Sequence, residues 1–216
     1  MPSDTPKPSE LSRTQEIRRE HIVQAALLVF ERDGFEAARM IDIADEAGVA
    51  KGTLYLYFEN KAALLEGVIQ TEVLPTIQAV GDAIEDFSGS ARDVLKNQIR
   101  TTAERMASPG MKILLKLMIS SGGQNPHIPK FYYENVLEPG VQLFRRTLEL
   151  GVETGEFKED VLDLDPVTLV GAHVYTGVWN ILFSEYAPLD IDAVIDGFTG
   201  TVMNGLLVTP DLKANS

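Results

Sequence analysis

The stretch that decides the fold is Met40-Ile41-Asp42-Ile43-Ala44-Asp45-Glu46-Ala47-Gly48-Val49-Ala50-Lys51-Gly52-Thr53-Leu54-Tyr55-Leu56-Tyr57-Phe58-Glu59-Asn60-Lys61-Ala62-Ala63-Leu64. Its apolar spacing predicts two short helices joined at Gly48, because a residue without a Cβ allows a tight turn. Leu54 and Phe58, four residues apart, are expected to face the core. Asn60 is expected to cap a further helix. This pattern is typical of a helix-turn-helix.

The segments on either side of this stretch predict further helices, and none shows the alternation of a strand between hairpin turns. A long amphipathic helix is expected over residues 14–33, ending at Gly34, which tolerates the left-handed conformation. The apolar pattern after Asn60 continues past Pro75, which predicts one helix kinked at that proline. Helices are also expected over the ranges 91–107, 108–119, 129–154, 165–186 and 190–208. The predicted fold class is therefore all-α, with about nine helices.

Several of these helices carry signals for their starts and bends. Ser90, followed three residues later by Asp93, predicts a capping box. Serine at position 108, followed by a proline at the first helical position, predicts another start. Asp190 is expected to cap the last helix, and Pro139 marks a candidate kink within 129–154.

The composition fits a packed protein without cysteine chemistry. Of the 216 residues, 44% are hydrophobic, which is enough for a sizeable core. The chain has no cysteine, which excludes disulfides, thiolate metal sites and cysteine nucleophiles. The N-terminus lacks the apolar segment of a secretory signal, and the longest uncharged run, 166–184, contains His173 and Asn180. We therefore expect a cytoplasmic protein without a membrane span.

The charge is uneven along the chain and argues against strong nonspecific binding to DNA. The formal net charge is −13. Residues 1–61 hold 8 Lys and Arg against 11 Asp and Glu, a net charge of −3, which leaves 11 against 21, or −10, for residues 62–216. Because Lys and Arg neutralise phosphates, a DNA-facing surface has to separate its few cations from its carboxylates by geometry.

The segment from Gly48 to Leu64 carries a resemblance to a known family. It reads Gly-Val-Ala-Lys-Gly-Thr-Leu-Tyr-Leu-Tyr-Phe-Glu-Asn-Lys-Ala-Ala-Leu. It resembles the TetR (tetracycline repressor) family of bacterial transcriptional regulators, whose pattern is Gly-Val-Ser-Lys-Gly-Thr-Leu-Tyr-x-Tyr/His-Phe-x-Ser/Asn-Lys-x-x-Leu. The match is ungapped, and the resemblance extends back over residues 14–47.

The resemblance implies a homodimer that binds double-stranded operator DNA. Each N-terminal three-helix domain would place its third helix in a major groove, and the last two helices would form the dimer interface. We expect a flexible arm over residues 1–12, because it holds three prolines and little that anchors a core. A helix-turn-helix DNA-binding domain is expected over 13–61, and a helical ligand-binding and dimerisation domain over 62–216.

The resemblance also assigns residues to the DNA interface by position. The expected DNA-facing set on the third helix is Lys51, Gly52, Thr53, Tyr55 and Tyr57. Lys61 is implied to clamp the DNA backbone at the start of its helix, where free N–H groups and partial positive charge favour phosphate. Without the resemblance, packing aromatics would be the favoured interpretation of the two tyrosines; with it, DNA contact is favoured.

Two departures from the family pattern affect the helix starts. Ala50 stands where the family usually has serine, and Ala38 and Arg39 stand where it usually has threonines. A missing capping hydroxyl typically costs about 0.5–2 kcal/mol. Arg39 is a further candidate for DNA contact, through a phosphate, with solvation or pairing to Glu36 or Asp42 as the alternatives.

The region after residue 61 is expected to hold a pocket with apolar walls and a few polar groups. Apolar and aromatic candidates for its lining, which also fit plain core positions, are Met106, Met111, Leu115, Met118, Phe144, Tyr175 and Trp179. A polar stripe at spacings of three and four on the 165–186 helix adds His173, Thr176 and Asn180. For the histidine, a ligand contact, a place on the dimer axis and a core hydrogen bond all remain open.

No metal site, cofactor or catalytic site is predicted. The three histidines lie in separate segments without the spacing of paired ligands. The chain has no nucleophile elbow, phosphate loop or dinucleotide fingerprint, so we do not expect an enzyme. The leading hypothesis is a repressor that binds a palindromic operator as a dimer and is released by a small apolar or aromatic effector. The alternative is an all-helical carrier of small molecules with little affinity for DNA.

Overall fold

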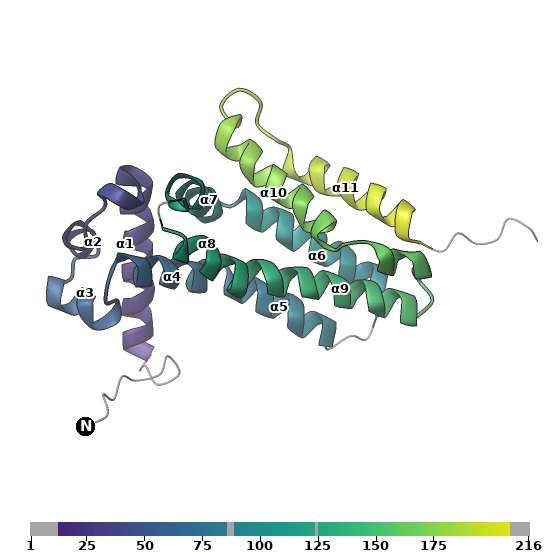
Figure 1. Cartoon of the computed structure of the whole chain (residues 1–216), viewed down its shortest axis with the longest axis horizontal. Coiled ribbons are helices and arrows are strands. Elements are labelled where there is room, and N and C mark those ends of the chain that lie inside the picture. The colour runs from purple at the N-terminus through teal and green to yellow at the C-terminus, as the bar shows by residue number, and fades with distance from the viewer. Residues whose placement is uncertain (1–12, 86–88, 124, 208–216) are drawn as a thin grey trace, which may run out of the picture. The chain divides into compact units, whose positions relative to one another are not determined.

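The computed structural model describes residues 13–85, 89–123 and 125–207, and these are almost entirely helical (Figure 1). Within these ranges the only β contact is an isolated bridge between Phe157 and Leu207, so the all-α prediction is confirmed. The helices are α1 (Arg13–Ala37), α2 (Met40–Glu46), α3 (Lys51–Tyr57), α4 (Lys61–Glu72), α5 (Leu74–Glu85), α6 (Ala91–Ala107), α7 (Pro109–Ser121), α8 (His127–Tyr132), η2 (Tyr133–Leu137), α9 (Glu138–Glu153), η3 (Glu159–Asp163), α10 (Val167–Leu182) and α11 (Ile191–Leu206). The predicted arm over residues 1–12 lies outside the described residues.

The chain divides into two compact units. The N-terminal unit comprises Met1–Glu72 and Leu117–Pro129, and the C-terminal unit comprises Val73–Lys116 and Lys130–Ser216. The chain therefore passes between the units at three points: between α4 and α5, within α7 and within α8. The predicted domain boundary after residue 61 stays a prediction.

Helix α1 organises the N-terminal unit by packing against α2 and α4, and α2 in turn packs against α3. The helical conformation of α1 is interrupted at Gly34, whose φ of 76° is left-handed, at the position where the sequence predicts the helix to end. Side chains from all four helices fill one apolar core. Its largest fully buried members include Ile22, Phe30, Ile43, Leu54, Leu64, Leu65 and Ile69.

The helix predicted to run through Pro75 with a kink is divided into two helices, α4 and α5. Val73 forms a turn between them, so the prediction of one continuous helix is wrong. Pro75 is the second residue of α5, where a missing N–H removes no intrahelical hydrogen bond. The next N–H, that of Thr76, bonds to the carbonyl of Val73 at 3.1 Å.

Helix α6 is central in the C-terminal unit and packs against α5, α9, α10 and α11 (Figure 1). Its buried Leu95 and Ile99 join Phe144 and Phe157 in the main apolar core of this unit. A Cβ on Gly151 of α9 would collide with the Phe157 ring, so this close approach requires glycine. The core therefore fixes α6 between α9 and the last two helices.

The start of α6 is capped by a residue from far along the chain. Ser90 makes no side-chain bond to the helix, so the predicted capping box with Asp93 is wrong. The Glu156 carboxylate instead accepts hydrogen bonds from the Ser90 hydroxyl and from the N–H groups of Ala91, at 2.7 Å, and Arg92, at 3.3 Å. Burial raises the pKa of Glu156, but these hydrogen bonds together outweigh it and leave the pKa below its ordinary value.

The later helices follow the sequence prediction with local differences. The range 129–154 is helical, but the π-helical segment η2 ends two residues before Pro139, whose missing N–H disturbs the regular hydrogen bonding. Helix α10 ends at Leu182, four residues before the predicted end. Asp190 caps α11 as predicted, because its carboxylate accepts from the N–H of Ala193 at 3.1 Å.

Candidate functional site

Helix α3 is anchored by two buried side chains. Gly48 makes the turn before the helix with a left-handed φ of 63°. Leu54 is fully buried and Phe58, directly after the helix, is 4% exposed, so the prediction that both face the core is confirmed. A Cβ on Gly67 of α4 would collide with the Phe58 ring, so the ring packs directly against the α4 backbone at this glycine. These contacts fix which face of α3 points outward.

The residues predicted to face DNA lie along the outer side of this short helix. Lys51, Gly52 and Tyr55 are exposed, whereas Thr53 and Tyr57 are partly buried. The Lys51 Nζ lies 5.8 Å from the centre of the Tyr55 ring, within cation–π distance. A Cβ on Gly52 would meet nothing within 4 Å, so the backbone there is open to a close approach. The structure thus brings together an ammonium, an aromatic ring and an uncovered backbone.

Arg39, the residue before α2, is paired within its own turn. Its Nε and Nη2 donate to the two carboxylate oxygens of Asp42 at 2.8 and 2.6 Å. The hydrogen bond from Arg39 holds the pKa of Asp42 below its ordinary value, and the same contact raises the pKa of Arg39. Of the alternatives for this arginine, the structure records pairing with Asp42. A phosphate contact would have to replace that pair.

Lys61 joins the start of α4 to the end of α1. Its Nζ donates to the carbonyl oxygens of Glu36 at 2.9 Å and Ala38 at 3.0 Å, and lies 4.7 Å from the centre of the Phe35 ring. Burial lowers the pKa of this lysine. Two of its three donors are therefore used inside the unit. The implied role as a clamp on the DNA backbone stays a prediction.

An open groove of about 530 Å³ runs beside the start of α3. Arg18 and His21 of α1 line it on one side, and Ala50 and Thr53 line it on the other. Arg18 is exposed on α1 and is not among the residues predicted to face DNA. Because Arg18 lines the same groove as Ala50 and Thr53, it lies next to the predicted DNA interface.

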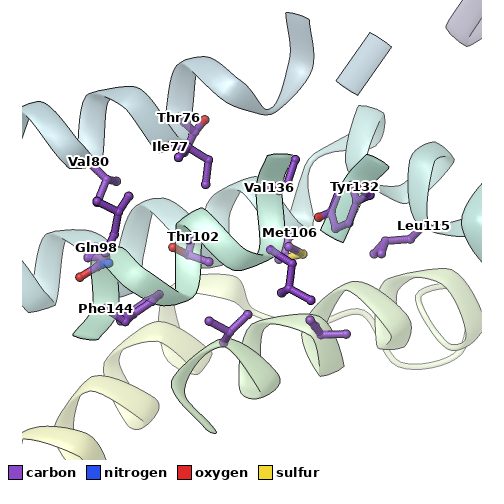
Figure 2. A pocket seen from close by; sticks show the side chains of 15 residues that line it. Thr76, Ile77, Val80, Gln98, Thr102, Met106, Leu115, Tyr132, Val136 and Phe144 are labelled. Carbon is purple, nitrogen blue, oxygen red and sulfur yellow. The ribbon is translucent and has the colours of Figure 1, made fainter. Parts of the chain in front are cut away.

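A cavity of about 250 Å³ lies within the C-terminal unit (Figure 2). Residues from α5, α6, α7, α8, η2, α9 and α10 form its walls, which are predominantly apolar. The lining residues are Thr76, Ile77, Val80, Gln98, Thr102, Met106, Leu115, Tyr132, Val136, Leu137, Gly140, Leu143, Phe144, Val170 and Val174. A concave apolar space with a few polar groups is the usual form of a small-molecule site.

Three of the ten predicted ligand-binding residues line this cavity, namely Met106, Leu115 and Phe144. Met111 is fully buried outside the lining, and Met118 belongs to the N-terminal unit. The indole N–H of Trp179 donates to the carbonyl of Ala187 at 2.7 Å, and Asn180 is partly buried on α10; neither lines the cavity. For these residues, contact with a ligand stays a prediction.

The remaining three candidates, His173, Tyr175 and Thr176, line a second cavity of about 270 Å³ between α6, α10 and α11. The His173 side chain is 3% exposed, and its Nε2 is buried without a hydrogen-bond partner in the described part of the chain. Its ring lies between those of Phe144, at 6.3 Å, and Phe198, at 5.3 Å. Burial lowers the pKa of His173 to about 4, so the imidazole is neutral at pH 7.

Sequence reasoning missed most of the polar lining of the first cavity. Gln98 and Thr102 belong to the segment where only Met106 was predicted, and Tyr132 belongs to the one where only Phe144 was predicted. One signal was present: Gln98 lies between Leu95 and Ile99, on a helix face that is otherwise apolar. A lone amide on such a face has to find a partner or line a cavity.

The described residues include neither a metal-binding cluster nor a membrane-spanning helix. They contain no cluster of three or more His, Asp or Glu side chains placed to hold a metal ion. No helix within the ranges that the structure describes is long and apolar enough to cross a membrane.

Two family models match the chain. The model of bacterial regulatory proteins of the tetR family matches residues 22–68, and the model of the tetracyclin repressor-like C-terminal domain matches residues 85–196. Among similar proteins, the HTH-type transcriptional repressor KstR2 of Rhodococcus jostii is 22% identical over 214 residues, covering 94% of this chain and 97% of that protein. The HTH-type transcriptional regulator YerO of Bacillus subtilis is 26% identical over 200 residues, with 88% and 68% covered.

Solved structures agree with these matches at the level of the fold. The transcriptional regulator FadR from Bacillus subtilis, in complex with stearoyl-CoA, superposes with a TM-score of 0.73 at 23% identity, covering 86% of this chain and 98% of that one. The ketosteroid transcriptional regulator KstR2 of Mycobacterium tuberculosis superposes with a TM-score of 0.61 at 21% identity, with 89% and 96% covered.

Proposed function

This chain belongs to the TetR family of bacterial regulatory proteins, and we propose that it is a repressor which binds a palindromic operator as a dimer and releases it when an effector fills the C-terminal cavity. The observation that carries the proposal is the outward face of α3, held by the buried Leu54 within the matched segment. In this proposal, the apolar cavity of the C-terminal unit is the effector site.

The proposed DNA contacts are the outward residues of α3 inserted into a major groove. Lys51 neutralises phosphate charge, Tyr55 offers a hydroxyl and a ring to the groove, and the bare Gly52 allows close approach. Thr53, Tyr57, Arg39 and Lys61 complete the proposed set. Arg18 adds a cation from the neighbouring groove, which helps an acidic protein to hold DNA.

The proposed dimer forms through α10 and α11. Helix α10 is apolar on most sides, and such a helix is normally buried on most sides. In the single chain, however, large apolar side chains of α10 and the turn after it are exposed. They are Tyr175 at 62%, Leu182 at 56%, Phe183 at 43% and Tyr186 at 85%. A second copy of the chain would cover them, as expected for an exposed apolar patch in a two-fold assembly.

The proposed release is a shift between conformations of the dimer. The two α3 helices have to lie about 34–36 Å apart to enter successive major grooves. An effector that binds more tightly to a dimer with another spacing lowers operator affinity by that difference. Helix α4 begins at Lys61, and the next helix, α5, supplies Thr76 and Val80 to the cavity wall. The turn at Val73 between them is the proposed pivot.

The test is a titration of labelled DNA from upstream of the protein's own gene, followed by fluorescence anisotropy. Wild-type protein should bind with a strong dependence on salt, and Tyr55→Ala should weaken binding at least about tenfold. Tyr133→Ala, which removes a tyrosine 52% exposed in the C-terminal unit, is the matched control and should bind like wild type. Unchanged affinity in Tyr55→Ala, with dimers intact by sedimentation, would remove that residue from the interface.

The same titration separates the repressor from a carrier protein. A carrier would bind small molecules in its cavity and show no salt-dependent affinity for any operator fragment. That outcome would overturn the proposed function for the whole chain, whereas the loss of one contact would not.

A further inference from the structure

The polar end of the first cavity defines the kind of effector that fits it. We propose, resting on the function proposed above, that the effector is an uncharged and largely apolar molecule of about ten non-hydrogen atoms with one hydroxyl group. The hydroxyl binds between Gln98 and Thr102, and the apolar part extends along Met106 towards Leu115.

The volume of the cavity sets the size of this ligand. Benzene, with its six carbons, occupies an engineered apolar cavity of about 150 Å³. The same packing in a cavity of about 250 Å³ allows about ten non-hydrogen atoms. A ligand that fits entirely within this space is therefore a compact ring or a chain of medium length.

The lining requires the ligand to be uncharged. None of the 15 described side chains that line the cavity carries a formal charge. A carboxylate, phosphate or ammonium group would lose its hydration there without gaining a counterion. Burial raises the pKa of Tyr132 to about 12, against an opposing effect of Arg105, so the phenol stays neutral at pH 7. Arg105 itself is not part of the lining.

Two polar residues of the lining, Gln98 and Thr102, lie on one face of α6, whereas Thr76 belongs to α5 and Tyr132 to α8. Gln98 and Thr102 are four residues apart and so lie on the same side of the helix, with Met106 one turn further on (Figure 2). The Gln98 side chain is 2% exposed, and its Oε1 lies 3.0 Å from the Thr147 hydroxyl. Thr147 is not part of the lining, so it contacts the amide oxygen from the side away from the cavity and in this sense holds the amide from behind. The other edge of the amide remains available to a ligand.

A hydroxyl is the group that matches this pair. An amide edge and a threonine hydroxyl next to each other offer both donor and acceptor capacity. A ligand hydroxyl donates one hydrogen bond and accepts another, so it can pair with Gln98 and Thr102 at the same time. An alkane of the same size would leave the buried amide without a partner on this side, which is unfavourable.

The experiment compares nonan-1-ol, which has the proposed size, with nonanoate, by titration calorimetry on the full-length protein at pH 7.5. Nonan-1-ol should bind at least about 30-fold more tightly than nonanoate. Gln98→Leu should weaken binding of nonan-1-ol about tenfold. Gln78→Leu, the same substitution at an exposed site on α5, should leave it unchanged. Equal binding of nonanoate, or no effect of Gln98→Leu, would overturn the proposal.

Two further measurements keep the outcomes distinct. Circular dichroism checks the fold of Gln98→Leu, and Thr102→Val, which keeps the Gln98–Thr147 contact, should show a smaller loss of affinity in the same direction. Operator anisotropy with saturating nonan-1-ol tests release. If the protein binds its operator but no nonan-1-ol, the ligand class fails while the repressor function stands. If the alcohol binds without releasing the operator, the ligand class stands and the proposed release fails.

Discussion

Two cavities in the C-terminal unit have similar volumes but hold their buried polar side chains differently. The first, beside Gln98, measures about 250 Å³, and the second, beside His173, about 270 Å³. Gln98 is hydrogen bonded to Thr147, whereas the His173 Nε2 has no partner in the described part of the chain. Phe144 lines the first cavity and lies 6.3 Å from the His173 ring, so the two sites are neighbours.

Gln98 is therefore a buried polar group that a hydrogen bond holds in position, whereas His173 is buried without such a bond at its Nε2. A partner behind the amide fixes Gln98, so it can present one edge to a ligand without losing its own hydrogen bond. The Nε2 of His173 has no such partner in the described part of the chain, and a buried nitrogen without a hydrogen bond costs about 1–3 kcal/mol. The first cavity therefore suits recognition, and the second contains a group whose removal should stabilise the fold.

The largest expected effect is the pH dependence that His173 imposes on stability. Its pKa is lowered from 6.5 to about 4 in the folded protein. Between these values the unfolded chain binds the proton and the folded chain does not, so stability falls as the pH is lowered from 6.5 to 4. The loss approaches about 3 kcal/mol. Urea unfolding followed through Trp179, the single tryptophan, reports on this unit.

His173→Leu should remove that part of the pH dependence and raise stability at pH 7 by about 1–3 kcal/mol. His21→Leu, which replaces an exposed imidazole in the N-terminal unit, is the control and should keep the wild-type profile. A His173→Leu protein that loses as much stability as wild type between pH 6.5 and 4 would show that His173 has a partner in solution.

The next effect concerns two threonines that differ in one contact. Both are buried, and each hydroxyl lies within hydrogen-bond distance of the carbonyl oxygen four residues earlier, that of Leu143 at 3.1 Å for Thr147 and that of Ala172 at 3.3 Å for Thr176. The single hydroxyl proton of Thr147 is shared between the Leu143 carbonyl and the Gln98 Oε1. Only Thr147 also meets Gln98. Thr147→Val should therefore destabilise the protein by about 1–3 kcal/mol, because it leaves the buried amide without its partner.

Thr176→Val is the matched control for that substitution, and it should cost less than about 1 kcal/mol, because the backbone carbonyl that it leaves keeps its helical hydrogen bond. Urea midpoints of the two variants, compared at equal m-value, check the difference. Equal destabilisation would mean that the Gln98 contact adds nothing and that the amide is not held from behind.

The N-terminal unit is closer to its sequence prediction because its contacts are local. The turn at Gly48, the burial of Leu54 and Phe58, and the cap at Asn60, whose Oδ1 accepts from the N–H of Ala63 at 2.9 Å, all connect residues a few positions apart. Periodicity and capping chemistry are enough to predict such features. The pairing of Arg39 with Asp42 is also local, since the two residues are three positions apart, and the sequence therefore offered it as one alternative for this arginine.

The C-terminal unit depends on contacts that no local pattern contains. Glu156 caps α6 from 65 residues away, and Thr147 meets Gln98 across 49 residues. A helical stripe shows which residues share a face but not what that face packs against. The polar stripe on α10 therefore suggested His173 as a ligand contact, whereas Gln98 and Thr102, which line the first cavity, belong to α6.

The smallest expected effect is that of removing both partners of the Gln98–Thr147 pair. A lone buried amide or a lone buried hydroxyl is costly, but replacing both by apolar side chains of similar shape can be nearly neutral. The double variant Gln98→Leu with Thr147→Val should therefore lie within about 1 kcal/mol of wild type, so that the two single costs do not add. Combining Gln98→Leu with Thr176→Val gives the control cycle, in which the costs should add. If the first cycle is additive as well, the two side chains do not interact in solution, and the cavity beside Gln98 loses the feature that distinguishes it from the one beside His173.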